Sequence, residues 1–218
     1  MSSPKKELLN SLLLTPPKPW NSYNSQIRPS QQAKVANSDL EPKISIFNNL
    51  NRGRVAIFID GRSLFYAALQ LGIEVDYTKL LHCLISDNKL LRPFFYTGFD
   101  STNDKQHNFL LWMRHHGYRV IAKELTEFAD GSKKADLNIE ITVDMMTLIG
   151  SYDTAVLVSG DGNLAYAVNA ISYKGVRVEI VSLRSMTSEN LINVADAYVD
   201  LLEIKDCIQK TPVPEVCS

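Results

Sequence analysis

Two aspartates occupy matching positions, each shortly after an apolar run and next to a glycine. Asp60 follows the run RVAIFI, and Asp161 closes the stretch AVLVSGD. Ligands of open α/β sheets bind beyond the carboxyl ends of the strands. Two carboxylates that converge there repel one another unless a cation lies between them, and their hard oxygens suit Mg²⁺ or Mn²⁺. The alternative is that each aspartate only caps the helix that follows it, and the sequence leaves both interpretations open.

A third group of acids lies in the segment KKADLNIEITVDMM. It contains three carboxylates spaced by four residues: Asp136, Glu140 and Asp144. On a helix, residues four apart are offset by only about 40°, so the three side chains share one face. That face is either part of a site or a solvated acidic stripe. Lys133 and Lys134 begin the segment and are candidates for phosphate contacts, although a pair of lysines alone is weak evidence.

The elements that must position these acids alternate between strand and helix. Apolar β-branched runs predict strands at 54–59, 93–96, 119–122, 154–158 and 177–181. Helical spacing predicts helices after the first strand and around 80–84, 109–113, 137–149 and 163–173. Repeated βα units with fully apolar strands indicate an α/β fold, with a mostly parallel sheet of five or six strands and helices on both faces.

Composition narrows the class of protein. The chain has 218 residues, a net charge of −1 and a pI near 6.4, so nucleic-acid binding would require a local basic patch. Cys83, Cys207 and Cys217 are odd in number and widely spaced, which indicates reduced thiols in a cytoplasmic protein and argues against structural zinc. No apolar stretch is long enough to span a membrane. The GxSxG and GxGxxG patterns are also absent.

The chain divides into one domain and two tails. Residues 1–52 are expected to be a flexible tail, with a short helix at 5–14 that either frays or docks on the domain, a second copy or a protein partner. Residues 53–204 form the expected domain and residues 205–218 a C-terminal tail. Apolar residues at 197–202 suit core packing or a homodimer.

Three segments, taken together and in order, resemble the NYN family, and within it the LabA-like proteins of cyanobacteria. They are VAIFIDGRSLFYA, KKADLNIEITVDMM and AVLVSGDGNLAYAVNAISYKGVRVEIVS. The resemblance implies a PIN-like three-layer sandwich, RNA as the substrate class and Mg²⁺ or Mn²⁺ as cofactor. The family's acids fall on Asp60, Asp144 and Asp161, as catalytic and metal-binding residues. Arg62, Lys133 and Lys134 would then position phosphates.

Other positions depart from the family pattern. Ser63, Asn138 and Asn163 stand where the family usually has Asn, Asp and Asp, and Asp136 stands where Asn is common. The site therefore has two fewer carboxylates, unless Asp136 turns in. An amide brings no charge to a cation and is a poor general base, so at most one weakly bound ion is expected.

Two functions follow from this altered site. One is a metal-dependent ribonuclease with a partly degenerate acidic site. The alternative is a weak or inactive RNA- or protein-binding regulator of gene expression, since the LabA-like branch is associated with circadian control. A third interpretation is a structural or dimerising domain whose pocket is vestigial.

Overall fold

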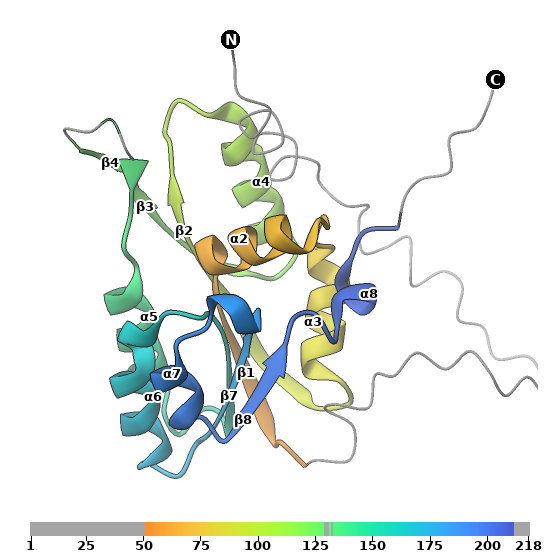
Figure 1. The fold of residues 1–218 in the computed structure, drawn as a ribbon, viewed down its shortest axis with the longest axis vertical. Coiled ribbons are helices and arrows are strands. Elements are labelled where there is room, and N and C mark those ends of the chain that lie inside the picture. Colours follow the sequence, from red (N-terminus) through yellow and green to blue (C-terminus); the bar gives the residue numbers. More distant parts are fainter. Residues whose placement is uncertain (1–50, 129–130, 132, 212–218) are drawn as a thin grey trace, which may run out of the picture.

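A six-stranded parallel sheet forms the centre of the molecule in the computed structural model, which describes residues 51–128, 131 and 133–211 (Figure 1). The strand order is β3-β2-β1-β6-β7-β8. The bounds are β1 Arg54–Asp60, β2 Lys89–Phe99, β3 Arg119–Glu124, β6 Thr154–Val158, β7 Arg177–Ser182 and β8 Ala197–Asp200. A separate two-stranded hairpin, β4 Thr126–Glu127 and β5 Lys133–Lys134, extends beyond the end of β3.

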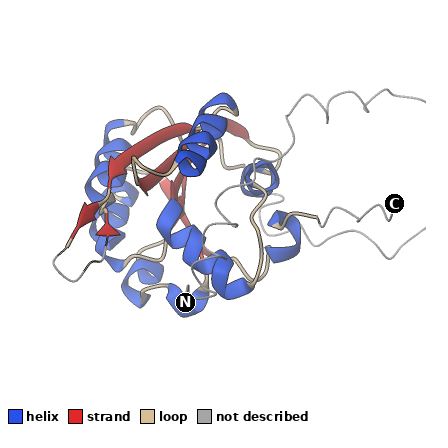
Figure 2. Cartoon of the chain, turned by 90° about the horizontal axis from the view of Figure 1, so that it is seen from above, coloured by secondary structure: helices blue, strands red, loops and turns tan. Residues whose placement is uncertain are grey.

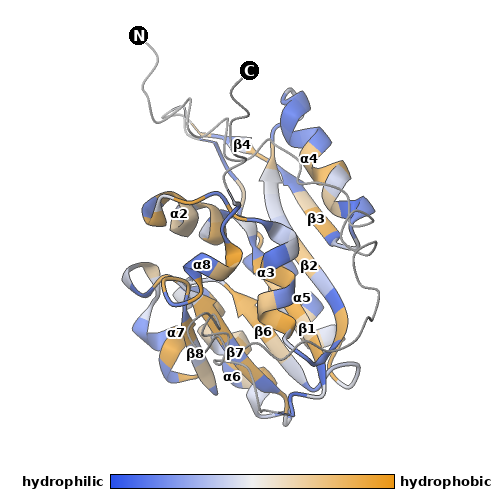
Figure 3. Cartoon of the chain, turned by 90° about the vertical axis from the view of Figure 1, so that its right-hand side faces the viewer, coloured by the Kyte–Doolittle hydropathy of each residue, from blue (hydrophilic) through white to orange (hydrophobic). Residues whose placement is uncertain are grey.

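The central strands are buried on both faces, which explains their continuous apolar sequence. Val55 to Ile59 of β1 and every residue of β6 are inaccessible to solvent. Figure 3 shows the resulting hydrophobic centre of the sheet beneath more polar helices. Each central strand thus contributes side chains to two cores.

The helices cover both faces of the sheet (Figure 2). One apolar cluster joins the sheet to α2 Gly61–Leu71, α3 Tyr77–Ile85, α4 Asp104–His115 and α8 Lys205–Ile208. The other joins it to α5 Asn138–Thr147, α6 Ala165–Ser172 and α7 Glu189–Asn193. Short 3₁₀ turns, η3 Gly162–Leu164 and η4 Arg184–Met186, precede α6 and α7. The expected PIN-like α/β sandwich is therefore confirmed.

The segment at 197–202 belongs to the sheet. Ala197–Asp200 forms the edge strand β8, and Val199 and Leu201 are buried in the core. Leu202 is the exposed apolar residue of this segment, at 58%. Core packing therefore explains most of the apolar character that also suited a homodimer.

Residues on both sides of the predicted domain, 53–204, also pack against it. Arg52, placed in the tail by its sequence, is fully buried and pairs with Glu179. Residues 205–208 form α8, whose Ile208 is buried in the core. The helix expected at 5–14 lies outside the described residues. Within the described part of the chain, no helix is long and apolar enough to cross a membrane.

Candidate functional site at the carboxyl edge of the sheet

Asp60 both caps a helix and points one oxygen towards the neighbouring strand. It ends β1, and its Oδ1 accepts the backbone N–H groups of Arg62 at 3.0 Å and Ser63 at 3.2 Å. Its Oδ2 accepts the hydroxyls of Ser63 and Ser159. The capping interpretation is thus correct, and one oxygen of the same carboxylate remains within the site.

Asp161 has the same dual arrangement at the end of the adjacent strand. Its Oδ1 caps η3 by accepting the backbone N–H of Asn163 at 2.9 Å. Its backbone N–H donates to the Ser159 hydroxyl at 3.2 Å, and that hydroxyl in turn donates to Asp60 at 3.2 Å. The pairing of β1 with β6 therefore brings Asp60 and Asp161 to one place, with Ser159 between them.

The second oxygen of Asp161 accepts a hydrogen bond from an amide. Asn138 Nδ2 donates to Asp161 Oδ2 at 2.8 Å, from the first residue of α5. Asn138 thus lies at the site. The Asn163 side chain is exposed, and its backbone N–H makes the cap described above.

Asp144 is held by a residue that sequence reasoning missed. The Tyr96 hydroxyl donates to Asp144 Oδ2 at 2.9 Å. Tyr96 lies opposite Asp60 in the parallel register of β1 and β2, so it ends at the same edge of the sheet. Burial, together with the neighbouring Asp144, raises the pKa of the Tyr96 hydroxyl, which keeps it a donor. The sequence places Tyr96 at the end of a predicted strand, and this position could have identified it as a residue at the carboxyl edge of the sheet.

The other two acids of the α5 segment do not join Asp144. Asp136 is exposed, lies just before α5, and accepts the backbone N–H of Asn138 at 2.9 Å. Glu140 turns away to form an ion pair of 3.0 Å with Lys123 of β3. The three acids expected on one helix face therefore lie in three different environments, and Asp136 does not turn into the site.

Basic side chains surround this edge of the sheet. Lys133 pairs with Asp100, just beyond β2, at 2.9 Å. Lys134 lies 5.9 Å from the ring of Phe128 across the hairpin. The Arg62 guanidinium lies 6.0 Å from the ring of Tyr66, on the exposed side of α2. All three side chains are exposed to solvent, so an anion could bind to them.

The glycines beside the acids allow close approach of the chain to itself. A Cβ on Gly61 would lie 2.9 Å from the carbonyl oxygen of Tyr96, and one on Gly160 would lie 2.3 Å from that of Met186. Gly61 therefore lets α2 begin against β2, and Gly160 lets the η4 loop pack beneath the Ser159–Asp161 turn.

A divalent cation would fit this donor set poorly. Among the described residues, no group of three or more His, Cys, Asp or Glu side chains is arranged to hold a metal ion. Each of the three carboxylates already accepts a neutral donor: serine hydroxyls at Asp60, the amide at Asp161 and the phenol at Asp144. A cation would have to displace these donors, and Asn138 would have to reverse its amide to offer oxygen.

Comparison with known proteins adds three similarities. The model of the NYN domain family matches residues 54–203. The low amplitude and bright protein LabA of Synechococcus elongatus is 36% identical over 170 residues, which cover 74% of this chain and 91% of that protein. A crystal structure of a protein of unknown function from Vibrio parahaemolyticus superposes with a TM-score of 0.63 at 25% identity, covering 73% of this chain and 98% of that one.

Proposed function

The chain belongs to the NYN domain family, and from that premise we propose that it is an RNA-binding regulator whose nuclease site no longer cleaves efficiently. The observation that carries the proposal is the hydrogen bond from the Asn138 amide to Asp161. The Asn138 amide is uncharged, so it adds no negative charge that would attract a cation. Its hydrogen bond also occupies the Asp161 oxygen that a metal ion would need as a ligand.

The physical consequence is a site that attracts a divalent cation weakly. Hydrolysis by a metal site requires the ion to lower the pKa of a bound water, and this depends on holding the ion firmly. Asn138 and Asn163 together remove two negative charges that the family pattern supplies. The same loss of charge lowers the repulsion between this edge of the sheet and a phosphate backbone.

RNA is the ligand that the surroundings of the site favour. Arg62, Lys133 and Lys134 are exposed cations at or near the edge where Asp60 and Asp161 lie. Phosphate contacts from such side chains supply affinity without sequence preference. The role in circadian gene expression that the LabA-like resemblance implies requires binding alone. A protein partner bound through residues 1–50 would involve a segment outside the described residues.

A one-ion ribonuclease using Mg²⁺ or Mn²⁺ is the second candidate. It is favoured by the convergence of Asp60 and Asp161 at Ser159, whose hydroxyl donates to the Asp60 carboxylate and accepts the Asp161 backbone N–H. Asp144 would be the third ligand. In that case the ion would displace the Asn138 amide, and cleavage would be slow but would depend on Asp60.

Restoring the missing acid distinguishes the two candidates. We expect the wild-type protein to bind labelled single-stranded RNA equally well with and without Mn²⁺, and to cut it no faster than Asp60→Asn. We expect Asn138→Asp, alone or with Asn163→Asp, to gain Mn²⁺-dependent cleavage, because it replaces the neutral amide by a carboxylate beside Asp161. Gel electrophoresis of the RNA and isothermal titration with Mn²⁺ give the two measurements.

The matched control is Asn108→Asp, which adds the same charge at an exposed position of α4, on the opposite face of the sheet from α5. It should leave both RNA binding and Mn²⁺ binding unchanged. Cleavage by the wild type that Asp60→Asn abolishes would support the ribonuclease instead. Failure of the wild type to bind RNA at low salt would contradict the proposal.

A further inference from the structure

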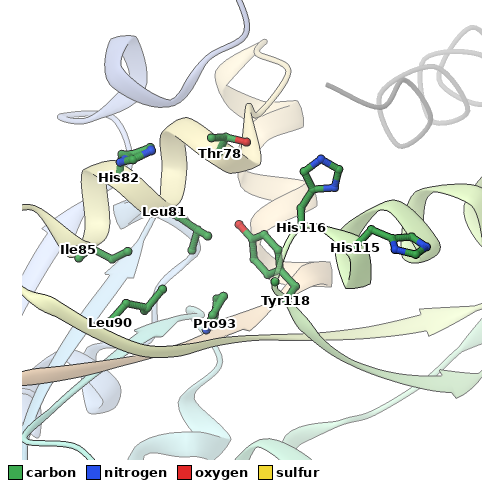
Figure 4. A pocket seen from close by; sticks show the side chains of 10 residues that line it. Thr78, Leu81, His82, Ile85, Leu90, Pro93, His115, His116 and Tyr118 are labelled. Carbon is green, nitrogen blue, oxygen red and sulfur yellow. The ribbon is translucent and has the colours of Figure 1, made fainter. Parts of the chain in front are cut away.

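An apolar cavity of about 490 Å³ lies far from the acids, between α3, the first half of β2 and the turn from α4 to β3. Its floor is aliphatic, and Leu81, Leu90 and Pro93 point towards one another between the helix and the strand (Figure 4). Ile85 closes one end, and His116 and Tyr118 form the other. Its volume lies in the range of roughly 300–1,000 Å³ typical of binding pockets.

One side of this cavity is an open strand edge. β3 begins its pairing with β2 at Phe94, opposite Arg119. Residues 89–93 of β2 therefore have no neighbouring strand on that side in the described part of the chain, while β1 pairs with them on the other. Leu91 is also an exposed apolar residue of this stretch. An open edge beside an apolar groove is the surface to which extended segments bind.

The chain enters the domain next to this groove. The Arg52 backbone N–H donates to Asn88 Oδ1 at 3.1 Å, and its guanidinium donates to the Leu84 carbonyl at 2.7 Å. A buried ion pair of 2.6 Å with Glu179 of β7 also fixes the Arg52 side chain. Asn51 therefore lies at the turn from α3 to β2, beside the Ile85 end of the cavity.

The residues just before this point are apolar at close intervals. The sequence 43–50 reads KISIFNNL, with Ile44, Ile46 and Phe47 within four positions. Reaching the open side of β2 from the start of β1 means crossing two strand spacings, about 10 Å. Four extended residues span about 13 Å, so residues 48–51 are long enough to make the crossing.

We propose that this groove binds residues 44–47 of the same chain, along the open edge of β2 and with their isoleucines towards the cavity. The segment enters from the Ile85 end, so it runs in the direction opposite to β2. Its apolar side chains match an aliphatic floor, and its backbone groups match the unpaired ones of the edge. This binding does not depend on the function proposed for the acidic site.

Hydrogen exchange on the full-length protein tests the proposal. The variant replaces Ile44, Ile46 and Phe47 by serine, and the matched control replaces Leu8, Leu12 and Leu13, the other apolar cluster of the tail, by serine. We expect those amides of residues 89–92 that face the open edge to exchange about tenfold faster or more in the first variant, because loss of the bound segment exposes that edge. Their exchange in the leucine variant should match the wild type.

Both sets of substitutions lie before the folded domain, so unchanged exchange in β1 and β6 will show that each variant is folded. Equal exchange at 89–92 in the wild type and the first variant would overturn the proposal. So would faster exchange in the leucine variant alone, which would assign the groove to that cluster. Protection of 89–92 that rises with protein concentration would assign it to a second copy and would also overturn the proposal.

Discussion

At the scale of single residues, the site is organised by neutral donors around three charged carboxylates. Ser63 and Ser159 donate to Asp60, Asn138 donates to Asp161, and Tyr96 donates to Asp144. Hydrogen bonds to a charged group are stronger than those between neutral groups. These donors therefore hold each acid in place without requiring a cation.

The bond between Tyr96 and Asp144 is open to a direct test. We expect Tyr96→Phe to lower the free energy of unfolding by about 1.5–3 kcal/mol, because it removes a buried donor to a charged acceptor. Urea unfolding at neutral pH measures this loss.

Tyr152→Phe provides the matched control. Tyr152 is also buried. Its hydroxyl donates at 2.7 Å to a neutral acceptor, the backbone carbonyl of Met145, which lies next to Asp144 in α5. Its loss should cost about 1 kcal/mol. Equal losses in the two variants would contradict a special role for the charge of Asp144.

At the scale of elements, an ion pair ties the β4–β5 hairpin to the sheet. Lys133 of β5 contacts Asp100, just after β2, and Asp100 also accepts from Thr102. The hydrogen bonds from Thr102 and from Lys133 lower the pKa of Asp100 to about 2. The pair therefore positions Lys133 near the carboxyl edge while leaving it exposed.

The pKa of Asp100 gives a prediction with a definite sign. The pKa of Asp100 in the folded protein lies below its ordinary value of about 4. The contribution of this carboxylate to folding stability is therefore complete above about pH 4, and it is lost as the pH falls through about 2. We expect Lys133→Met to raise this pKa, measured by NMR of the side-chain carboxyl. Lys134→Met, which removes a cation placed over Phe128 instead, should leave it unchanged. An equal rise in both variants would argue for a general field effect.

At the scale of the whole molecule, the folded unit is larger than its sequence pattern indicates. Arg52 links the start of β1 to α3 and β7, and α8 covers the sheet beside α3. Both segments looked like tails because residues 51–53 are Asn, Arg and Gly, and α8 is only four residues long. Their contacts are long-range, with residues more than 30 positions away in the case of Arg52.

The contribution of α8 can be measured by truncating its buried side chain. We expect Ile208→Ala to lower the free energy of unfolding by about 2–5 kcal/mol, because it leaves a cavity in the core. Leu202→Ala, at a position that is 58% exposed, should change it by less than about 0.5 kcal/mol. Denaturant unfolding of both variants makes the comparison. If Ile208→Ala is as mild as Leu202→Ala, α8 is not part of the cooperative unit.

The sequence by itself determined the alternation of strands and helices, and with it the placement of Asp60 and Asp161 at one edge. Buried parallel strands have continuous apolar sequences, and their carboxyl ends share an edge, so both conclusions require only local patterns. The capping roles of these two aspartates were likewise local. The sequence also located the altered positions, Asn138 among them.

Only the tertiary structure decided which partner each acid meets. Spacing placed Asp136, Glu140 and Asp144 on one helix face, but the rotation of α5 against the sheet sends Glu140 to Lys123 and Asp144 to Tyr96. Tyr96 reaches the site because β2 pairs with β1. The order of strands in a sheet cannot be predicted from the local spacing of apolar residues. The direction of the Asn138 amide, on which the proposed function rests, depends on the carboxylate that the fold places opposite it.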